Sequence, residues 1–198
     1  MLFDISMPMP SADYLATALQ LLQLRTLYGY PPQNYLNDYG TRVLQNDVAY
    51  PFLVNYDAVC NLVGHAYTQL EKAYPDAKFL LVDWNAGDWL LNTRTQLTSN
   101  DHSTVVANSP MAVGQINRLL NFGCLHTDDD NYLLAQLAKR KADVVAYFAD
   151  KPDKLLVMQP TDGWDVLCPF LGNTVPGVAF PTPTYQKVPA AGLTGRRK

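Results

Sequence analysis

The N-terminal segment carries the apolar pattern of a strand followed by that of a helix. Residues 2–6 form a short apolar run that ends at a Met-Pro-Met-Pro sequence, because proline cannot donate a hydrogen bond to a strand ladder. Ser11 is a favourable N-cap residue, and leucines at positions 15, 19 and 22 then recur on one helical face through about Leu24. The pattern predicts a strand, a turn and a helix.

The next part of the chain has one poorly patterned stretch and one regular one. Residues 28–56 are rich in Tyr, Asn, Asp and Pro, so we expect irregular structure there, with a short helix over 39–44. Over residues 57–74 apolar side chains recur at helical spacing until Pro75 interrupts them. This spacing predicts a helix.

A compact apolar run over residues 78–82 predicts a strand, and it is followed by a turn at 84–87. Asp88 is a suitable N-cap for the helix that we expect after this turn. Residues 98–109 are polar and are expected to form a loop. The chain thus repeats its opening order of strand, turn and helix.

The C-terminal part predicts two further helices, a strand and a last helix. Strands that alternate with helices are typical of a parallel sheet covered by helices, so the expected class is α/β, in one domain of residues 1–198. From about residue 173 a proline-rich segment predicts an extended tail. The elements expected before this tail are helices over 111–123 and 128–148, a third strand over 154–158 and a helix over 163–171.

Composition narrows the function. Fifteen basic against 18 acidic residues argue against nucleic-acid binding, and Glu71 is the single glutamate, so mechanisms that need paired glutamates are excluded. Three widely spaced cysteines form neither a disulfide framework nor a zinc motif, which favours a reducing, cytoplasmic compartment. Neither a signal peptide nor an apolar run of about 18 residues is present, so no membrane span is expected.

Histidines are the first candidates for chemistry. His65 lies in the helix expected over 57–74, where it is either a catalytic base or a half-buried structural histidine, and Asn61 precedes it by one turn on the same face. His102 and His126 lie near aspartates, but their spacing fits no compact ligand set, so no metal site is expected. Trp89 and Trp164 are expected in the core.

Three segments resemble motifs of the small P-loop sulfotransferase-like family, whose members transfer a sulfuryl group from 3′-phosphoadenosine 5′-phosphosulfate (PAPS). The first pattern is C-terminal and long: it covers residues 147–157, the GWDVLCPFLG sequence of 163–172, and the VP and FP pairs within 175–181. The second is Tyr-Asp-Ala-Val at 56–59 with YPDAKFLLV at 74–82 and Trp89, and the third is the N-terminal strand with Pro8, Leu15 and Ala18-Leu19. The resemblance implies a three-layer, P-loop-type parallel sheet flanked by helices, with the cofactor at the carboxyl ends of the strands.

The phosphosulfate loop departs from the family pattern. In the family, glycine, a basic residue and hydroxyl side chains bind the phosphosulfate at the first turn. Here the basic position is Met9, the glycine is Ser11, and two hydroxyl positions are Ala12 and Asp13, while Pro10 removes a backbone donor. A carboxylate in the first turn of the following helix also repels an anion.

The site for the 3′-phosphate departs in the same direction. Family members end the corresponding strand in Arg-Asp-Pro, and the arginine grips the phosphate together with a later serine. Here Trp84-Asn85-Ala86 occupies the turn and Asn92 the serine position, so no bidentate guanidinium remains there. Trp84 either stacks on a ligand ring in the vacated cleft or fills that cleft.

Two main hypotheses follow. In the first, the protein keeps the fold, uses no cofactor, and binds a protein partner or a small molecule at a remodelled cleft of Asn61, His65, Trp84 and Asn85. In the second, it is an active PAPS-dependent sulfotransferase on a small hydroxyl-bearing acceptor, with His65 or an aspartate as the base. The second needs a replacement cation, for which the candidates are Arg25, Arg94 and Arg118. A role as a subunit of an oligomer or larger assembly is a third possibility, which predicts a large apolar surface patch.

Overall fold

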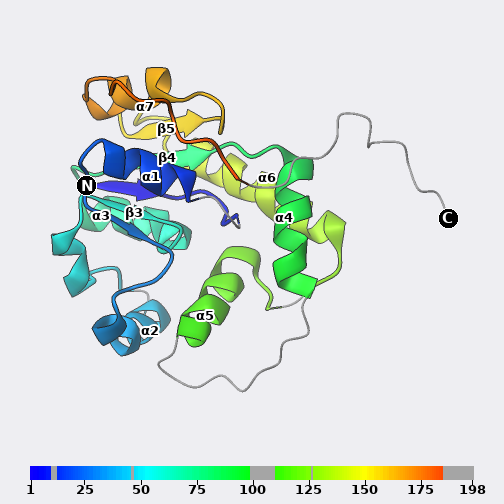
Figure 1. The fold of residues 1–198 in the computed structure, drawn as a ribbon. Helices are drawn as coiled ribbons and strands as arrows, with labels where there is room; N and C mark the ends of the chain where they lie inside the picture. The colour runs from blue at the N-terminus through cyan, green and yellow to red at the C-terminus, as the bar shows by residue number, and fades with distance from the viewer. Residues whose placement is uncertain (10–12, 46, 99–109, 126, 185–198) are drawn as a thin grey trace, which may run out of the picture.

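The computed structural model describes residues 1–9, 13–45, 47–98, 110–125 and 127–184. Its centre is a five-stranded parallel sheet with the strand order β2-β3-β1-β4-β5 (Figure 1). Each strand leads into a segment that contains at least one helix. In chain order the strands are β1 (Leu2–Asp4), β2 (Thr26–Tyr28), β3 (Ala58–Cys60), β4 (Lys78–Val82) and β5 (Leu155–Met158).

Helices surround this sheet (Figure 1). Two of them, α2 and α5, lie against each other, and α4 contacts α6. Three short 3₁₀ turns, Gln33–Tyr35, Pro51–Asn55 and Gly64–Ala66, join the elements around β2 and β3. The α-helices of the described ranges are α1 (Tyr14–Leu21), α2 (Leu36–Leu44), α3 (Tyr67–Ala73), α4 (Ala86–Thr98), α5 (Pro110–Phe122), α6 (Asp130–Tyr147) and α7 (Trp164–Leu171).

Both faces of the sheet are apolar, because successive residues of a strand point to opposite faces. In β4, Leu80 and Val82 belong to one buried cluster, and Phe79 and Leu81 belong to the other. The first cluster includes side chains of α1 and α7, and the second includes side chains of α2, α3 and the C-terminal half of α6. The chain therefore forms helix, sheet and helix layers, which confirms the expected α/β class.

Most of the expected elements of the C-terminal half are confirmed. The strands expected over 78–82 and 154–158 are β4 and β5, and the helices expected over 111–123 and 163–171 are α5 and α7. The long helix is α6, which starts where its aspartates predict, because Asp129 Oδ1 accepts a hydrogen bond from the backbone N–H of Tyr132 at 3.0 Å. Beyond α7, residues 173–184 contain neither helix nor strand.

The helix expected over 57–74 is wrong in its first half, which contains β3 between β1 and β2. All three residues of β3 are buried, and a strand covered on both faces is not distinguished from a buried helix by apolar periodicity. Asn61 then adopts a φ of 55°, and α3 begins only at Tyr67. With β2, which the pattern also missed, the sheet has five strands where three were expected.

Two helix starts also differ from expectation. Asp88 is not the cap of α4: Asn85 Oδ1 accepts the N–H groups of Gly87 at 3.0 Å and Asp88 at 3.1 Å, so Asn85 caps a helix that starts at Ala86. Helix α2 starts at Leu36, ahead of the short helix expected over 39–44. Of the loop expected over 98–109, Thr98 is instead the last residue of α4. Residues 99–109 and Ser11, the expected cap of α1, lie outside the described residues.

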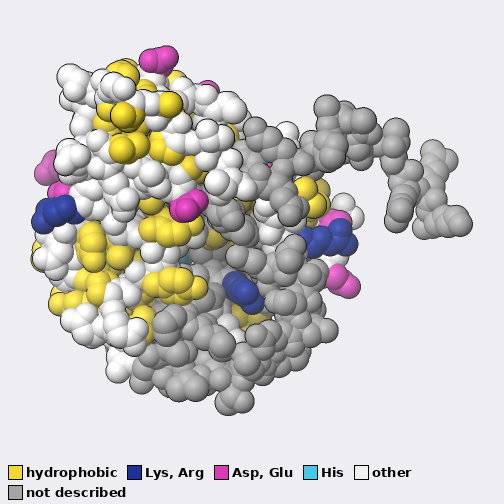
Figure 2. Space-filling model, in the orientation of Figure 1, with side chains coloured by type: hydrophobic (Ala, Val, Ile, Leu, Met, Phe, Trp, Pro, Cys, Tyr) yellow, Lys and Arg dark blue, Asp and Glu magenta, His cyan; other side chains and the backbone are white. Residues whose placement is uncertain are grey.

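The described surface carries apolar side chains in several separate areas on the face shown in Figure 2, with few charged side chains among them. No helix of the described ranges is both long and apolar enough to cross a membrane. The larger exposed apolar residues include Val54, Leu119, Leu125, Val175 and Val178.

Gly64 marks the closest approach between the turn after β3 and the end of β1. A Cβ at this position would lie 2.9 Å from Ile5 Cα and 3.1 Å from the carbonyl oxygen of Asp4. Both of these atoms belong to the backbone of the central strand region, so they have little freedom to move away. The absence of a side chain at residue 64 thus sets the spacing at the carboxyl edge of the sheet.

We expect Gly64→Ala to lower the free energy of unfolding by about 1 to 3 kcal/mol, because the added methyl group is forced against backbone. Gly40→Ala is the matched control: it lies in α2, and its Cβ would meet Ile116 Cδ1 at an ordinary 3.8 Å. That change should stabilise by roughly 0.5 to 1 kcal/mol through helix propensity. Urea unfolding followed by circular dichroism measures both, and equal effects would contradict the close approach.

Candidate functional site

The candidate site lies at the carboxyl edge of the sheet around β1. The strand order places β3 on one side of β1 and β4 on the other, so the direction of the chain connections reverses here. Open α/β sheets bind their ligands at such a switch point. The segments that meet there are residues 5–9 after β1, 61–64 after β3 and 83–85 after β4.

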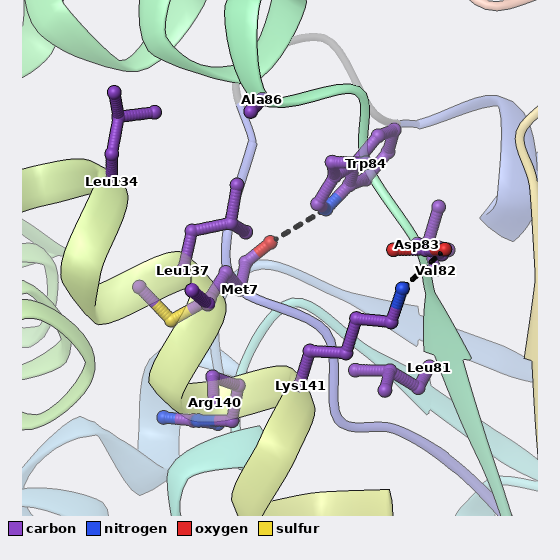
Figure 3. Close-up of a pocket in the computed structure, with 11 residues that line it drawn as sticks. Met7, Leu81, Val82, Asp83, Trp84, Ala86, Leu134, Leu137, Arg140 and Lys141 are labelled. Carbon is purple, nitrogen blue, oxygen red and sulfur yellow. Dashed lines mark hydrogen bonds and ion pairs between the residues drawn. The ribbon is translucent and has the colours of Figure 1, made fainter.

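Two tryptophans hold the loop after β1 by its backbone carbonyl groups. Trp84 Nε1 donates to the carbonyl oxygen of Met7 at 3.0 Å (Figure 3), and Trp89 Nε1 donates to that of Pro8 at 3.1 Å. The side chains of Met7, Met9 and Trp89 are at most 2% exposed, and Trp84 is 7% exposed. Trp84 is thus largely buried, and it also lines a cavity.

An aromatic cluster covers the start of α1. The ring of Tyr14, the first residue of α1, contacts Trp84 and Phe180 edge to face, with centroids 6.3 and 6.2 Å apart. Phe180 in turn contacts Trp164 at 4.8 Å, and Trp164 Nε1 donates to the carbonyl oxygen of Val178 at 2.8 Å. The described tail segment therefore packs beside the N-terminus of α1. Trp89 and Trp164 lie in the core, as expected.

The remaining positions matched to the cofactor site have structural contacts. Asp13 is exposed at the N-cap of α1 and makes no side-chain cap hydrogen bond, while its carbonyl oxygen accepts the N–H of Thr17 at 2.9 Å. Asn92 Nδ2 donates to the carbonyl oxygen of Asp88 at 2.7 Å, within α4. Pro10, Ser11 and Ala12 lie outside the described residues.

A polar network connects the carboxyl ends of β1 and β4. Asp4 Oδ1 accepts hydrogen bonds from the backbone N–H and the hydroxyl of Ser6, and Ser6 Oγ accepts the N–H of Val82 at 2.7 Å. Burial raises the pKa of the Asp4 carboxyl, while these bonds and the backbone N–H of Asn61 act in the opposite direction. Asn61 thus contributes its backbone to this network.

An apolar cavity of about 260 Å³ lies beside Trp84, between the end of β4, the loop after β1 and α6 (Figure 3). At its rim, Lys141 Nζ pairs with Asp83 Oδ2 at 2.7 Å, and Gln159 Nε2 donates to the same oxygen at 2.9 Å. The apolar lining consists mainly of Met7, Leu81, Trp84, Leu134 and Leu137.

Arg140 is a cation at this edge that sequence reasoning missed. Its Nη1 donates to the carbonyl oxygen of Gly64 at 3.0 Å and more weakly to that of Ile5 at 3.5 Å, and Nη2 donates to Asn121 Oδ1 at 3.2 Å. Burial lowers the pKa of this guanidinium. Its position facing the sheet could have been predicted, because Arg140 shares the helical spacing of Leu133, Leu137 and Val144 on the inner face of α6.

Two of the three arginines proposed from the sequence are paired elsewhere. Arg25 forms a two-bonded pair with Asp57, in which Nε and Nη2 each donate at 2.9 Å, just before β2 and β3 and hence at the amino edge of the sheet. Arg94 pairs with Asp130 at 3.2 Å. Arg118, the third, is part of α5.

His65 lies in the 3₁₀ turn after β3, not in a continuous helix with Asn61 as expected. Its Nδ1 atom is buried and has no hydrogen-bond partner among the described residues. Burial, with a contribution from Arg140, lowers the pKa of His65 to about 4, so the ring is neutral at physiological pH. His65 and Trp84 line different cavities, and neither Asn61 nor Asn85 lines either of them.

The cysteines and the metal candidates do not extend this site. Burial raises the pKa of the thiols of Cys60 and Cys168, which disfavours the reactive thiolate form of both. The described residues contain no group of three or more His, Cys, Asp or Glu side chains arranged to hold a metal ion. His102 and His126 lie outside the described residues.

The family comparison agrees with the fold and with the sequence motifs. A family model described as a sulfotransferase domain matches residues 18–187. A search of curated proteins finds no match. The matched segment includes β2 to β5, the carboxyl edge of β3 and β4, and α6 with Arg140. Because this match spans most of the chain, the protein belongs to the sulfotransferase domain family.

Proposed function

We propose that this member of the family does not transfer a sulfuryl group from PAPS and instead binds a small, largely apolar molecule in the cavity beside Trp84. The observation that carries the proposal is the pair of indole hydrogen bonds to the carbonyl groups of Met7 and Pro8. A loop that binds phosphosulfate presents backbone N–H groups to the anion. Here the described part of the loop has its carbonyl groups bound and its methionine side chains buried.

The residues present do not fit PAPS. Trp84 stands where the family pattern implies an arginine for the 3′-phosphate, and its ring is packed against Tyr14. The nearest lysine, Lys141, is already paired with Asp83, and Asp13 places a carboxylate at the start of α1. At an effective dielectric constant near 20, like charges about 4 Å apart cost roughly 4 kcal/mol, which opposes binding of an anion beside Asp13.

The cavity suits a compact apolar ligand. Its volume of about 260 Å³ is near the lower end of ordinary small-molecule pockets. Met7, Leu134 and Leu137 supply apolar contact, and the indole of Trp84 offers an aromatic wall. The paired Lys141 and Asp83 at the rim add a polar end that can orient a ligand hydroxyl. A bicyclic phenol matches this combination of size and polarity.

Active sulfuryl transfer to such a phenol is the second candidate function. The observation in its favour is Arg140, a cation at the carboxyl edge of β1 that lines the same cavity. Sulfuryl transfer requires positive charge near the sulfonate group as the bond to the leaving phosphate breaks. Both candidates share a ligand class and differ in whether the nucleotide binds.

We expect isothermal titration calorimetry with adenosine 3′,5′-bisphosphate, the product nucleotide, to detect no binding up to about 0.1 mM. The reason is that the loop after β1 is closed by Trp84 and Trp89 and offers no free guanidinium at residue 84. Trp84→Arg supplies the cation that the family pattern implies. It should also fail to bind the nucleotide, because the side chains of Met7 and Met9 stay buried in the loop.

Micromolar binding by the natural chain would overturn the proposal in favour of sulfuryl transfer. Binding by Trp84→Arg alone would show that a missing cation, and not closure of the loop, is the cause. Transfer of labelled sulfate from PAPS to 2-naphthol provides the direct assay of the second candidate, and a sustained product signal above the no-enzyme rate would establish it.

The apolar cavity is tested with 2-naphthol and a pair of matched variants on α6. Ala138 lines the cavity, and Ala142 lies one helical turn further along and does not. We expect saturable quenching of tryptophan fluorescence in the natural chain, since Trp84 forms part of the wall. Ala138→Phe should weaken binding by about tenfold or more by filling the space, a loss of about 1.4 kcal/mol. Ala142→Phe should bind as the natural chain does, and equal binding by both variants would place the ligand elsewhere.

A further inference from the structure

We propose that a second cavity, which shares Arg140 with the apolar one, is a binding site for a small oxyanion such as a carboxylate or a sulfate. This cavity has a volume of about 280 Å³ and lies between the turn after β3, the C-terminal end of α5 and the middle of α6. In contrast to the cavity beside Trp84, its lining is mostly polar. The polar side chains that the argument uses are His65, Tyr67, Asn121, Gln136, Lys139 and Arg140.

Arg140 supplies a charge that its protein contacts leave without a counter-ion. Its three hydrogen bonds go to two backbone carbonyl groups and one amide oxygen, and no carboxylate of the described residues lies within 4 Å of it. A guanidinium has five N–H groups. Nε and one N–H of Nη2 thus have no partner in the described chain. Arg140 is partly buried, and its Nε is not among the buried atoms that lack a partner, so a ligand in the cavity can reach it. A charge-assisted hydrogen bond to an anion would use these open donors.

Another arginine of this protein shows that the Nε and Nη2 donors of a guanidinium bind a carboxylate. Arg25 holds the carboxylate of Asp57 with Nε and Nη2, the same two nitrogen atoms that keep open donors in Arg140. Paired N–H groups of this kind match the two oxygens of a carboxylate or of a sulfate. Arg25 is exposed at the amino edge of the sheet, whereas Arg140 lines a cavity at the carboxyl edge.

His65 is the second, independent observation. Its Nδ1 atom is buried without a hydrogen-bond partner among the described residues, although its ring lines the cavity. Buried polar atoms in native proteins nearly always have a partner, so an orphaned ring nitrogen indicates a missing ligand or water. The imidazole can complete an oxyanion site by donating a hydrogen bond from Nδ1–H to it.

The charges around the cavity leave it net positive. Lys139 and Asp143 both line the cavity, and Lys139 Nζ pairs with the Asp143 carboxylate, so these two charges compensate each other. Asp4 is held by Ser6 and by the backbone of Asn61 and interacts with Arg140 only over a longer distance, and Tyr67 is neutral at physiological pH because burial raises its pKa. The charge of Arg140 is therefore the uncompensated one.

An anion beside His65 also predicts a pH effect with a definite sign. In the free protein the pKa of His65 is lowered to about 4, so the folded state resists protonation and stability falls as the pH drops from 6.5 toward 4. A bound anion favours the imidazolium and raises this pKa. The groups that face the ring or interact with it are Tyr67, Lys139, Arg140 and Asp143. Saturating anion should therefore reduce the loss of stability between pH 6.5 and 4.

The test titrates the full chain with sodium sulfate and, separately, with sodium acetate, against sodium chloride at equal ionic strength. Nuclear magnetic resonance of the His65 ring, assigned by His65→Gln, reports binding and the pH midpoint. We expect a saturable shift with at least one probe and a higher midpoint when it is bound. The probe that saturates at lower concentration distinguishes a tetrahedral from a planar oxyanion.

Matched variants decide whether the cavity is the site. Gln136→Glu adds a carboxylate to the lining, and Ala135→Glu adds the same charge one residue away on the exposed side of α6. The first should weaken anion binding by about tenfold or more, and the second by much less. Arg140→Lys should weaken anion binding to a similar degree. If this variant does not fold, the comparison of Gln136→Glu with Ala135→Glu still tests whether the cavity is the binding site. No saturable shift with either probe, or equal weakening by both glutamate variants, would overturn the proposal.

Discussion

Two indole hydrogen bonds fix the position of the loop that follows the carboxyl end of β1. Trp84 and Trp89 follow β4 directly, and their hydrogen bonds to the carbonyl groups of Met7 and Pro8 draw the loop after β1 toward the start of α4. Each bond adds only about 0.5 to 1.5 kcal/mol, but the bonds orient large side chains whose burial contributes more. The same contacts bury the described part of the loop after β1 and form a wall of the apolar cavity, so the buried loop and the cavity depend on one arrangement.

The other side of β1 is held by contacts of a different kind. Gly64 allows the turn after β3 to approach Ile5, and Arg140 then connects both backbones from α6 through their carbonyl groups. Toward β4, the hydroxyl of Ser6 accepts the N–H of Val82. All three strand ends at the switch point are therefore joined by the chain's own polar groups. In a nucleotide-binding relative, part of this edge has to remain available for ligand phosphates.

Local pattern predicted more of the fold than of the site. The strands at 78–82 and 154–158 and the long helix α6 were predictable, because each has a distinct apolar run or a clear start signal. The strand β3 was not, since three buried residues followed by further apolar positions resemble a helix until the left-handed Asn61 is known. The family resemblance led us to expect Trp84 where family members have an arginine. It did not predict that the indole bonds Met7, which is 77 positions away in the chain. Arg140 was missed for the same reason, because its role arises from contact with Gly64, 76 positions away.

Membership of a family of transferases does not by itself establish the chemistry of this chain, which depends on the residues at its site. A tryptophan in place of the arginine that the family pattern implies differs in charge, volume and hydrogen bonding together, because an indole donates one bond and fills space that a guanidinium leaves to its ligand. Once Met7 and Met9 are buried behind it, the return of a single cation would leave the carbonyl of Met7 without its donor and a guanidinium among apolar side chains. Arg140, in contrast, is anchored by three oxygens at the same edge and still has open donors. Positive charge at this edge thus comes from α6 in this protein, through Arg140, which lines both cavities.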